Sequence, residues 1–280
     1  VNRHGKLQAA LARAREQREG GSPQKATKSP AAKRTVSRNT AQSEALTALW
    51  RSVALVEPSP RRMQQSRIFA SSASSEAASF DILRTKLLLE MRRNDWTRIA
   101  VTSAAAGSGK TTMACNLIAG LGRQPDLRGM LFDFDLRRPS VAKFFGLTPQ
   151  SGIADVLEGK VAFEDHALRL DANTIVCAQT RPVRDPAKTL MRESTGEILS
   201  DIQAEYAPDI MLFDLPPVLV SDEARAFLKL VDAAIIVAGA EQTTVTEVDE
   251  CEREVAGYTS VAGIVLNKCR HLSDGYGYSY

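Results

Sequence analysis

VTSAAAGSGKTT, residues 101–112, runs from an apolar, strand-like segment through a loop of small residues into a segment with helical spacing. Glycine and other small residues let backbone N–H groups turn toward a phosphate, and the N-terminus of the following helix adds the positive end of its dipole. Lys110 can then reach the β- and γ-phosphate oxygens, and the Thr111 hydroxyl can contact Mg²⁺. Ala104 takes the place of the first glycine of the pattern G-x-x-x-x-G-K-[ST]. The stretch therefore predicts a variant phosphate-binding loop.

The alternative interpretation is a glycine-rich turn that carries a lysine by chance. The context favours the phosphate loop, because residues 98–103 have the β-branched character of a strand and residues 113–119 the apolar spacing of a helix. We expect the following residues to bind the nucleotide: Ala105, Ala106, Gly107, Ser108, Gly109, Lys110, Thr111 and Thr112.

Two other apolar, strand-like segments carry carboxylates near their ends. Residues 129–135, GMLFDFD, hold Asp133 and Asp135 two positions apart, which alternation along a strand would place on one face. Residues 209–217, DIMLFDLPP, carry Asp214 just before a double proline that stops the strand. Ligands of open α/β sheets bind at the carboxyl ends of the strands. Because a buried carboxylate without a partner is costly, these residues favour a metal or phosphate complex.

Strand and helix patterns alternate along most of the chain, which predicts an α/β fold with a doubly wound, mostly parallel sheet and right-handed crossovers. The expected strands cover residues 98–103, 129–135, 174–178, 209–214, 233–238 and 262–267. The expected helices cover residues 79–92, 112–121, 152–159, 188–205, 221–230 and 244–258.

Charge divides the chain unevenly. Residues 1–75 carry 14 Lys and Arg against 4 Asp and Glu, whereas residues 76–280 carry 22 against 29. A segment as basic and as poor in large apolar residues as the first cannot bury enough surface to offset its ordering entropy. We therefore expect a basic, low-complexity, disordered extension over residues 1–75, a P-loop domain over 76–270 and a flexible, tyrosine-rich tail over 271–280.

The same composition limits the classes of partner. No apolar run reaches 18 residues, and charges interrupt the first 20 residues, so we expect neither a membrane span nor a signal peptide. The basic extension could contact anionic lipid or an acidic partner, or it could be a solvated linker. No aromatic residues alternate with its charges, so nucleic acid is not an expected ligand.

Taken together, AAAGSGKTT, MLFDFDLRRP and IMLFDLPP resemble the three nucleotide motifs of bacterial protein-tyrosine kinases, the BY-kinases of capsule and exopolysaccharide systems. The resemblance covers about residues 80–280 and includes SGIADVLEGK, LRTK, GIVLNK and the terminal tyrosines. It implies a P-loop, Min/Par-like kinase domain that uses ATP and Mg²⁺. It also implies autophosphorylation of C-terminal tyrosines and regulation of exopolysaccharide or capsule synthesis or export.

The resemblance also implies roles for individual residues, with Asp133 positioning or deprotonating the attacking tyrosine hydroxyl. The implied catalytic residues are Lys110, Asp133, Asp135 and Asp214, and the implied metal ligands are Thr111, Asp135 and Asp214. Three residues outside the loop join the nucleotide site: Arg137, Asn267 and Lys268. The implied phosphoacceptors are Tyr276, Tyr278 and Tyr280.

A membrane-embedded adaptor of the polysaccharide co-polymerase type is the implied partner. The chain would then be cytoplasmic and held at the inner face of the membrane by that adaptor. A homo-oligomer is also compatible with the resemblance. The chain departs from the family at Ser108, where an acidic residue is common, and in a ring-assembly helix motif that it matches only at Arg84 and Thr85.

Two other functions stay open at this point. A Min/Par-type switch ATPase has a related fold, but such proteins carry an extra lysine early in the loop, where this chain has Ala105. A regulatory subunit that binds a nucleotide with little turnover would carry the same motifs. Phosphorylation of the tail would separate the kinase from both.

Overall fold

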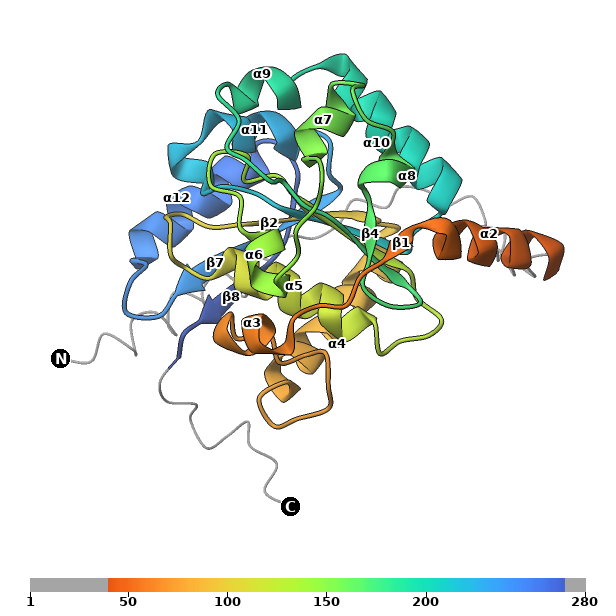
Figure 1. Cartoon of the computed structure of the whole chain (residues 1–280). Helices are drawn as coiled ribbons and strands as arrows, with labels where there is room; N and C mark the ends of the chain where they lie inside the picture. The colour runs from red at the N-terminus through yellow and green to blue at the C-terminus, as the bar shows by residue number, and fades with distance from the viewer. Residues whose placement is uncertain (1–39, 270–280) are drawn as a thin grey trace, which may run out of the picture. The chain divides into compact units, whose positions relative to one another are not determined.

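The structure, a computed structural model, describes residues 40–269 (Figure 1). Within them, eight strands form one sheet in the order β1-β4-β5-β3-β6-β2-β7-β8. Neighbouring strands run parallel except for the antiparallel pair β4 and β5. The strands are β1 (Ala54–Leu55), β2 (Arg98–Thr102), β3 (Gly129–Asp133), β4 (Leu168–Arg169), β5 (Thr174–Cys177), β6 (Ile210–Asp214), β7 (Ala233–Gly239) and β8 (Ser260–Asn267). This confirms the expected α/β fold with a mostly parallel sheet.

Helices cover both faces of the sheet (Figure 1). One group consists of α3 (Pro60–Gln65), α4 (Ala78–Asn94), α5 (Lys110–Leu121) and α6 (Val141–Phe145). The other consists of α7 (Ile153–Leu157), α8 (Phe163–His166), α9 (Pro186–Leu190), α10 (Glu193–Tyr206), α11 (Asp222–Leu228) and α12 (Val245–Ala256). Helix α2 (Thr40–Ser52) precedes β1, and a 3₁₀ turn, η1 (Val218–Val220), follows β6. None of these helices is both long and apolar enough to cross a bilayer.

The central strands are buried on both faces, as their apolar sequences require in a parallel sheet. Under the second helix group lies an aromatic cluster in which Phe132 stacks on Phe213 with ring centroids 5.0 Å apart, while Phe134 packs edge-on to Phe227 at 4.7 Å. Strands β3 and β6 are paired in register up to their last residues, so that Asp133 lies opposite Asp214. Both carboxylates therefore lie side by side at the carboxyl ends of these two central strands.

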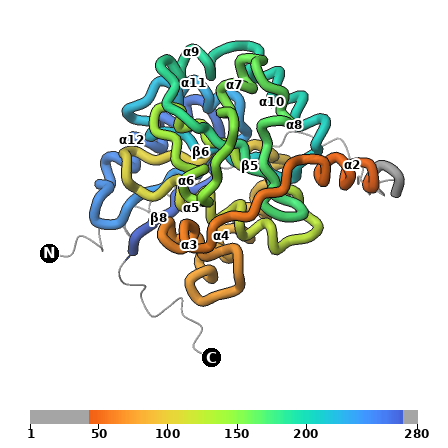
Figure 2. Tube along the Cα trace, in the orientation of Figure 1, coloured from red at the N-terminus to blue at the C-terminus, as the bar shows by residue number. Residues whose placement is uncertain are grey.

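The expectation of a disordered extension over residues 1–75 is wrong for residues 44–75, which belong to the folded body. Figure 2 follows this segment, in orange, from α2 to α3 beside α6. Trp50 and Val53 are each only 1% exposed, and β1 pairs with β4. The Trp50 indole donates a hydrogen bond to the Tyr206 carbonyl oxygen (2.8 Å). The segment has few large apolar residues, but Trp50 and Val53 are among them and both are buried in the hydrophobic core. Residues 1–39 of the predicted extension and the whole predicted tail, residues 271–280, lie outside the described residues.

Two expectations within the domain were also wrong. The single helix expected over residues 188–205 is two helices, because Arg192 is extended (ψ 138°) and the Thr195 hydroxyl donates to the Thr189 carbonyl oxygen (2.8 Å). Strand β3 ends at Asp133, so Asp135 lies in the following loop and strand alternation does not set its direction.

We predict that Trp50→Ala lowers the free energy of unfolding by about 3–5 kcal/mol, because it removes a buried aromatic side chain from the core. Leu55→Ala, five residues further on, is the control: Leu55 is 62% exposed, and its loss should cost less than about 0.5 kcal/mol. Urea denaturation of the full chain measures both values. Equal midpoints for the two variants would contradict a structural role for this segment.

Candidate active site

The loop between β2 and α5 has the backbone of a phosphate cradle. Gly107 and Gly109 have φ values of +86° and +93°, which favour glycine. A Cβ at Gly109 would lie 2.1 Å from Asn267 Nδ2, so a larger residue would displace the Asn267 side chain. Ala104 is buried and belongs to the larger hydrophobic cluster under the second helix group, so its methyl group, which departs from the common motif, is accommodated in the core. The variant loop therefore keeps the glycines that its conformation needs.

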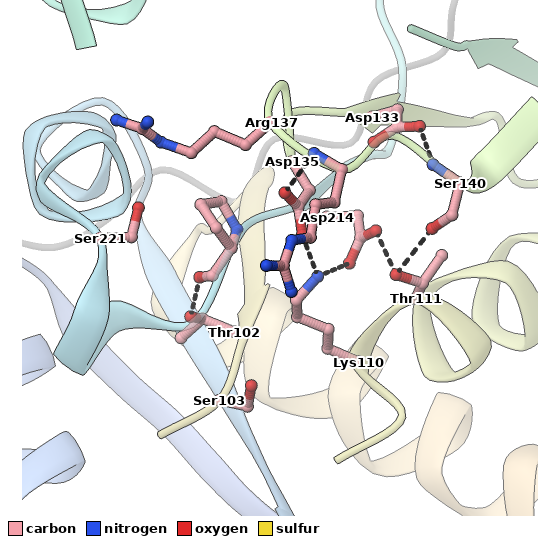
Figure 3. A network of polar contacts seen from close by, with 12 residues as sticks. Thr102, Ser103, Lys110, Thr111, Asp133, Asp135, Arg137, Ser140, Asp214 and Ser221 are labelled. Atoms are coloured by element: carbon pink, nitrogen blue, oxygen red, sulfur yellow. Dashed lines mark hydrogen bonds and ion pairs between the residues drawn. The ribbon is translucent and has the colours of Figure 1, made fainter. Parts of the chain in front are cut away.

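Lys110 begins α5 and lies among carboxylates (Figure 3). Its Nζ atom is 2.7 Å from Asp135 Oδ2 and 3.8 Å from Asp214 Oδ1. Burial alone would lower the pKa of Lys110, but Asp214, Asp135 and Asp133 together raise it above its usual value. The lysine is therefore a charged ammonium group held beside the loop.

Thr111 follows and lies against the end of β6. Its hydroxyl donates to Asp214 Oδ2 (2.6 Å), and Ser140 Oγ is 3.4 Å from the same hydroxyl. Asp214 is fully buried, and burial raises its pKa although Lys110 and the Thr111 hydrogen bond oppose the shift. Asp135 accepts the Arg138 backbone N–H through Oδ1 (3.1 Å), which holds it beside Lys110. These contacts bring together the residues expected to hold Mg²⁺.

Asp133 is fully buried, and within the part of the chain that the structure describes only one of its two carboxylate oxygens has hydrogen bonds. Asp133 Oδ2 accepts the backbone N–H groups of Ser140 and Val141, each at 3.0 Å. Oδ1 has no hydrogen-bond partner among the described residues. Burial, and then the neighbouring charge of Asp214, raise the pKa of Asp133 well above its usual range. Such a carboxyl group has a higher proton affinity than an ordinary aspartate.

The donors present fit Mg²⁺, which prefers oxygen ligands and is usually bound by one or two carboxylates together with substrate phosphates. Asp214 Oδ1 is a second buried oxygen without a hydrogen bond among the described residues, although Lys110 lies nearby. No group of three His, Cys, Asp or Glu residues in residues 40–269 has the geometry of a complete metal cage. The site thus suits an ion that arrives with a nucleotide.

A cleft of about 830 Å³ opens above these groups. Eight of the eleven expected nucleotide residues line it: Ala106, Gly107, Gly109, Lys110, Thr111, Thr112, Arg137 and Lys268. The expected metal ligand Asp135 lines it as well. Asp133 and Asp214 lie behind this lining. Asn267 ties the end of β8 to the loop, because its Nδ2 donates to the Ser108 carbonyl oxygen (2.9 Å).

Arg137 extends away from Lys110 (Figure 3). Its Nε donates to Glu223 Oε1 at 2.5 Å, so the guanidinium pairs with α11 and not with the lysine group. The sequence did not indicate Glu223, which is fully buried although it lies in the first turn of a helix. Ser140 was also missed, because its backbone contact with Asp133 forms only when the loop after β3 folds back.

Known proteins match this sequence and fold. A family model described as ParA: NUBPL iron-transfer P-loop NTPase matches residues 96–276. The tyrosine-protein kinase wzc of Salmonella typhi is 28% identical over 220 residues, covering 77% of this chain and 30% of wzc. The tyrosine-protein kinase YwqD of Bacillus subtilis is 26% identical over 222 residues, covering 78% of this chain and 92% of YwqD. The kinase domain of the Escherichia coli tyrosine kinase ETK matches with a TM-score of 0.66 and 25% identity, covering 74% of this chain and 82% of that domain.

The chain thus spans less than a third of the length of wzc but most of that of YwqD. The matches include the phosphate loop, the two aspartate-bearing strands and the strand that ends at Asn267. They confirm the resemblance on which the sequence expectations rested. The chain belongs to the ParA family of P-loop NTPases, and in sequence and fold it resembles the bacterial tyrosine-protein kinases.

Proposed function

We propose that this chain is an ATP-dependent protein-tyrosine kinase that phosphorylates Tyr276, Tyr278 and Tyr280 and regulates exopolysaccharide or capsule synthesis or export. The observation that carries the proposal is Asp133, a buried carboxylate beside a phosphate loop, one of whose oxygens has no hydrogen-bond partner in residues 40–269. Similarity to wzc, YwqD and ETK supports tyrosine as the acceptor. A membrane-embedded adaptor of the polysaccharide co-polymerase type, which would hold the chain at the inner face of the membrane, is part of the same proposal.

Nucleotide binding would use the loop backbone and Lys110. On binding, the Lys110 ammonium would exchange its 2.7 Å contact with Asp135 for the β- and γ-phosphate oxygens. Thr111, Asp135 and Asp214 would hold Mg²⁺, which neutralises charge on those oxygens when bound. Asn267 and Lys268 would lie on the adenine side of the cleft.

Asp133 would act on the acceptor. The tyrosine oxygen forms a bond to the γ-phosphorus, the bond from that phosphorus to the bridging oxygen breaks, ADP leaves, and the hydroxyl proton passes to Asp133 Oδ1. Its raised pKa suits this role, because a stronger base accepts the proton more readily. Asp133 lies behind Ser140, which lines the cleft, so the proposal includes a movement of the loop after β3 that opens Oδ1 to the acceptor.

A Min/Par-type switch ATPase would use the same fold without a tyrosine acceptor, and a regulatory subunit would bind the nucleotide with little turnover. The switch is disfavoured by Ala105 at the position of the extra lysine. Two curated relatives that are tyrosine kinases favour the kinase over both alternatives.

The test is mass spectrometry of the full chain after incubation with MgATP, alongside ADP release. We expect phosphate on tyrosines of residues 271–280, and each group should add about −1.5 to −2 charges. A control chain with Tyr276, Tyr278 and Tyr280 replaced by Phe should lack these phosphates while still binding MgATP. Steady ADP release with unmodified tyrosines, both in the tail and in an added adaptor, would instead identify a switch ATPase.

A further inference from the structure

The outer part of the cleft carries cations that nothing in the described chain neutralises. Arg62, Arg67, Arg138 and Lys143 all line it, and none has a side-chain hydrogen bond or ion pair within residues 40–269. The two acidic residues of the lining are already paired, Asp135 with Lys110 and Glu223 with Arg137. The cleft therefore presents an excess of positive charge beyond the lysine that the phosphate loop supplies.

The segment that carries Arg62 is fixed against α6. The Ser59 backbone N–H donates to the Phe145 carbonyl oxygen (2.8 Å) and starts α3 at this contact. Gly146 makes the approach possible: its φ is +72°, and a Cβ there would lie 2.6 Å from Ser59 Cβ and 2.9 Å from Arg62 Cγ. Arg62 is thus set beside α6 by backbone contacts that do not depend on its charge.

The helix of the phosphate loop fixes the other end of the segment. Asn116, fully buried on α5, accepts the backbone N–H groups of Phe69 (2.8 Å) and Ala70 (3.1 Å) through Oδ1. Its Nδ2 donates to the Arg67 carbonyl oxygen (2.9 Å), where the backbone takes a φ of +58°. One buried amide on the nucleotide helix therefore positions Arg67 at the cleft.

The same cleft has apolar lining residues. Phe144, Pro216, Pro217 and Val220 line it, and Val220 is 76% exposed although it is a large aliphatic residue. An aromatic ring can pack on such a surface, while anionic groups on either side of it would meet the cations. Apolar contact with flanking positive charge suits a tyrosine in an acidic sequence better than it suits a sugar or a neutral peptide.

We infer that this outer cleft is the acceptor site and that it selects tyrosine segments with anionic flanks, with Arg62 and Arg67 as specificity residues. The inference rests on the proposed kinase function and adds the chemical class of its substrate. Phosphotyrosine next to an unmodified tyrosine is also an anionic flank, so one phosphorylation should favour the next on the same segment.

Two peptides test the inference, each with one central tyrosine, flanked by glutamates in one and by glutamines in the other. For the unmodified full chain we expect a higher kcat/KM for the acidic peptide, and a preference that weakens as salt is added. In Arg62→Gln/Arg67→Gln the preference should fall about fivefold through the KM of the acidic peptide, while the KM of ATP stays the same. Lysine at both positions should restore most of the preference.

Arg61→Gln is the matched control, because Arg61 lies on the same helix, is exposed and does not line the cleft. The inference is overturned if the double variant keeps the wild-type preference. It is also overturned if the KM of ATP rises equally with either peptide, because the cations would then hold the nucleotide.

A binding measurement separates this inference from the proposed function. The acidic peptide with phenylalanine in place of tyrosine should bind the MgADP-loaded chain, with fluorescence anisotropy as the readout, and bind the double variant several-fold more weakly. Such binding without any phosphate transfer to tyrosine peptides would overturn the kinase but leave the acidic-segment site standing. Phosphate transfer to tyrosine peptides without this difference in binding would support the kinase but overturn the acidic-segment site.

Discussion

Lys110→Met should abolish MgATP binding and lower turnover at least about 10²-fold, the cost of removing a positioned charge from a phosphoryl-transfer site. The structure adds a second effect. Lys110 is the cation beside two buried carboxylates, Asp135 at 2.7 Å and Asp214 at 3.8 Å. Without it these carboxylates must take up protons or repel each other, so the pKa of Asp214, which Lys110 holds down, should rise further and the variant should lose stability as the pH rises.

Isothermal titration with ATP and Mg²⁺ measures the first effect, and urea denaturation at several pH values measures the second. Lys188→Met is the control, because Lys188 is exposed and does not line the cleft. Unchanged ATP affinity in the folded Lys110 variant would show that the loop is not the nucleotide site.

Asp133→Asn should lower phosphate transfer to tyrosine about 10²–10⁴-fold, the range for loss of a general base. Asparagine keeps the shape, and its oxygen can still accept the N–H groups of Ser140 and Val141. The affinity for MgATP should therefore change far less than the rate. Single-turnover transfer and nucleotide titration on the same preparation separate the two, and a rate within a few-fold of wild type would exclude Asp133 as the base.

The same substitution should change how stability depends on pH in the absence of nucleotide and Mg²⁺. In the unfolded chain Asp133 ionises near its ordinary pKa of about 3.9, whereas in the folded chain its pKa lies well above that. Between these two values the folded state binds more protons, so this group makes wild-type stability fall as the pH rises. The asparagine variant lacks this contribution, and its stability relative to wild type should increase over the same window.

Local signals were enough to predict the centre of this molecule. The phosphate loop, and the strands that end at Asp133 and Asp214, are short sequence patterns whose apolar runs, broken by turn or proline residues, are typical of buried strands. The proximity of Asp133 and Asp214 then follows from the topology, because neighbouring parallel strands have their carboxyl ends on the same side of the molecule. The roles of the individual site residues stay predictions that the experiments above test.

Residues 44–75 could not be predicted in this way, because partners far along the chain fix them. Strand β1 has two residues and exists only through its pairing with β4, and the Trp50 indole contacts a residue 156 positions away. The Asn116 amide that holds residues 67–70 lies within a helix whose sequence indicates only the phosphate loop. Composition averaged over the first 75 residues does not reveal such contacts, because a few buried side chains are enough to hold residues 44–75 in the folded body.

The contact between Asn267 and the phosphate loop also sets the length of a tether. Strand β8 ends there, and Lys268, the next residue, already lines the cleft. Tyr276 is eight residues further along the sequence, a span of at most about 28 Å when fully extended. A connection this short gives an effective concentration in the millimolar range. An acceptor tethered at this point needs little intrinsic affinity, whereas an untethered substrate would depend on the cations of the cleft.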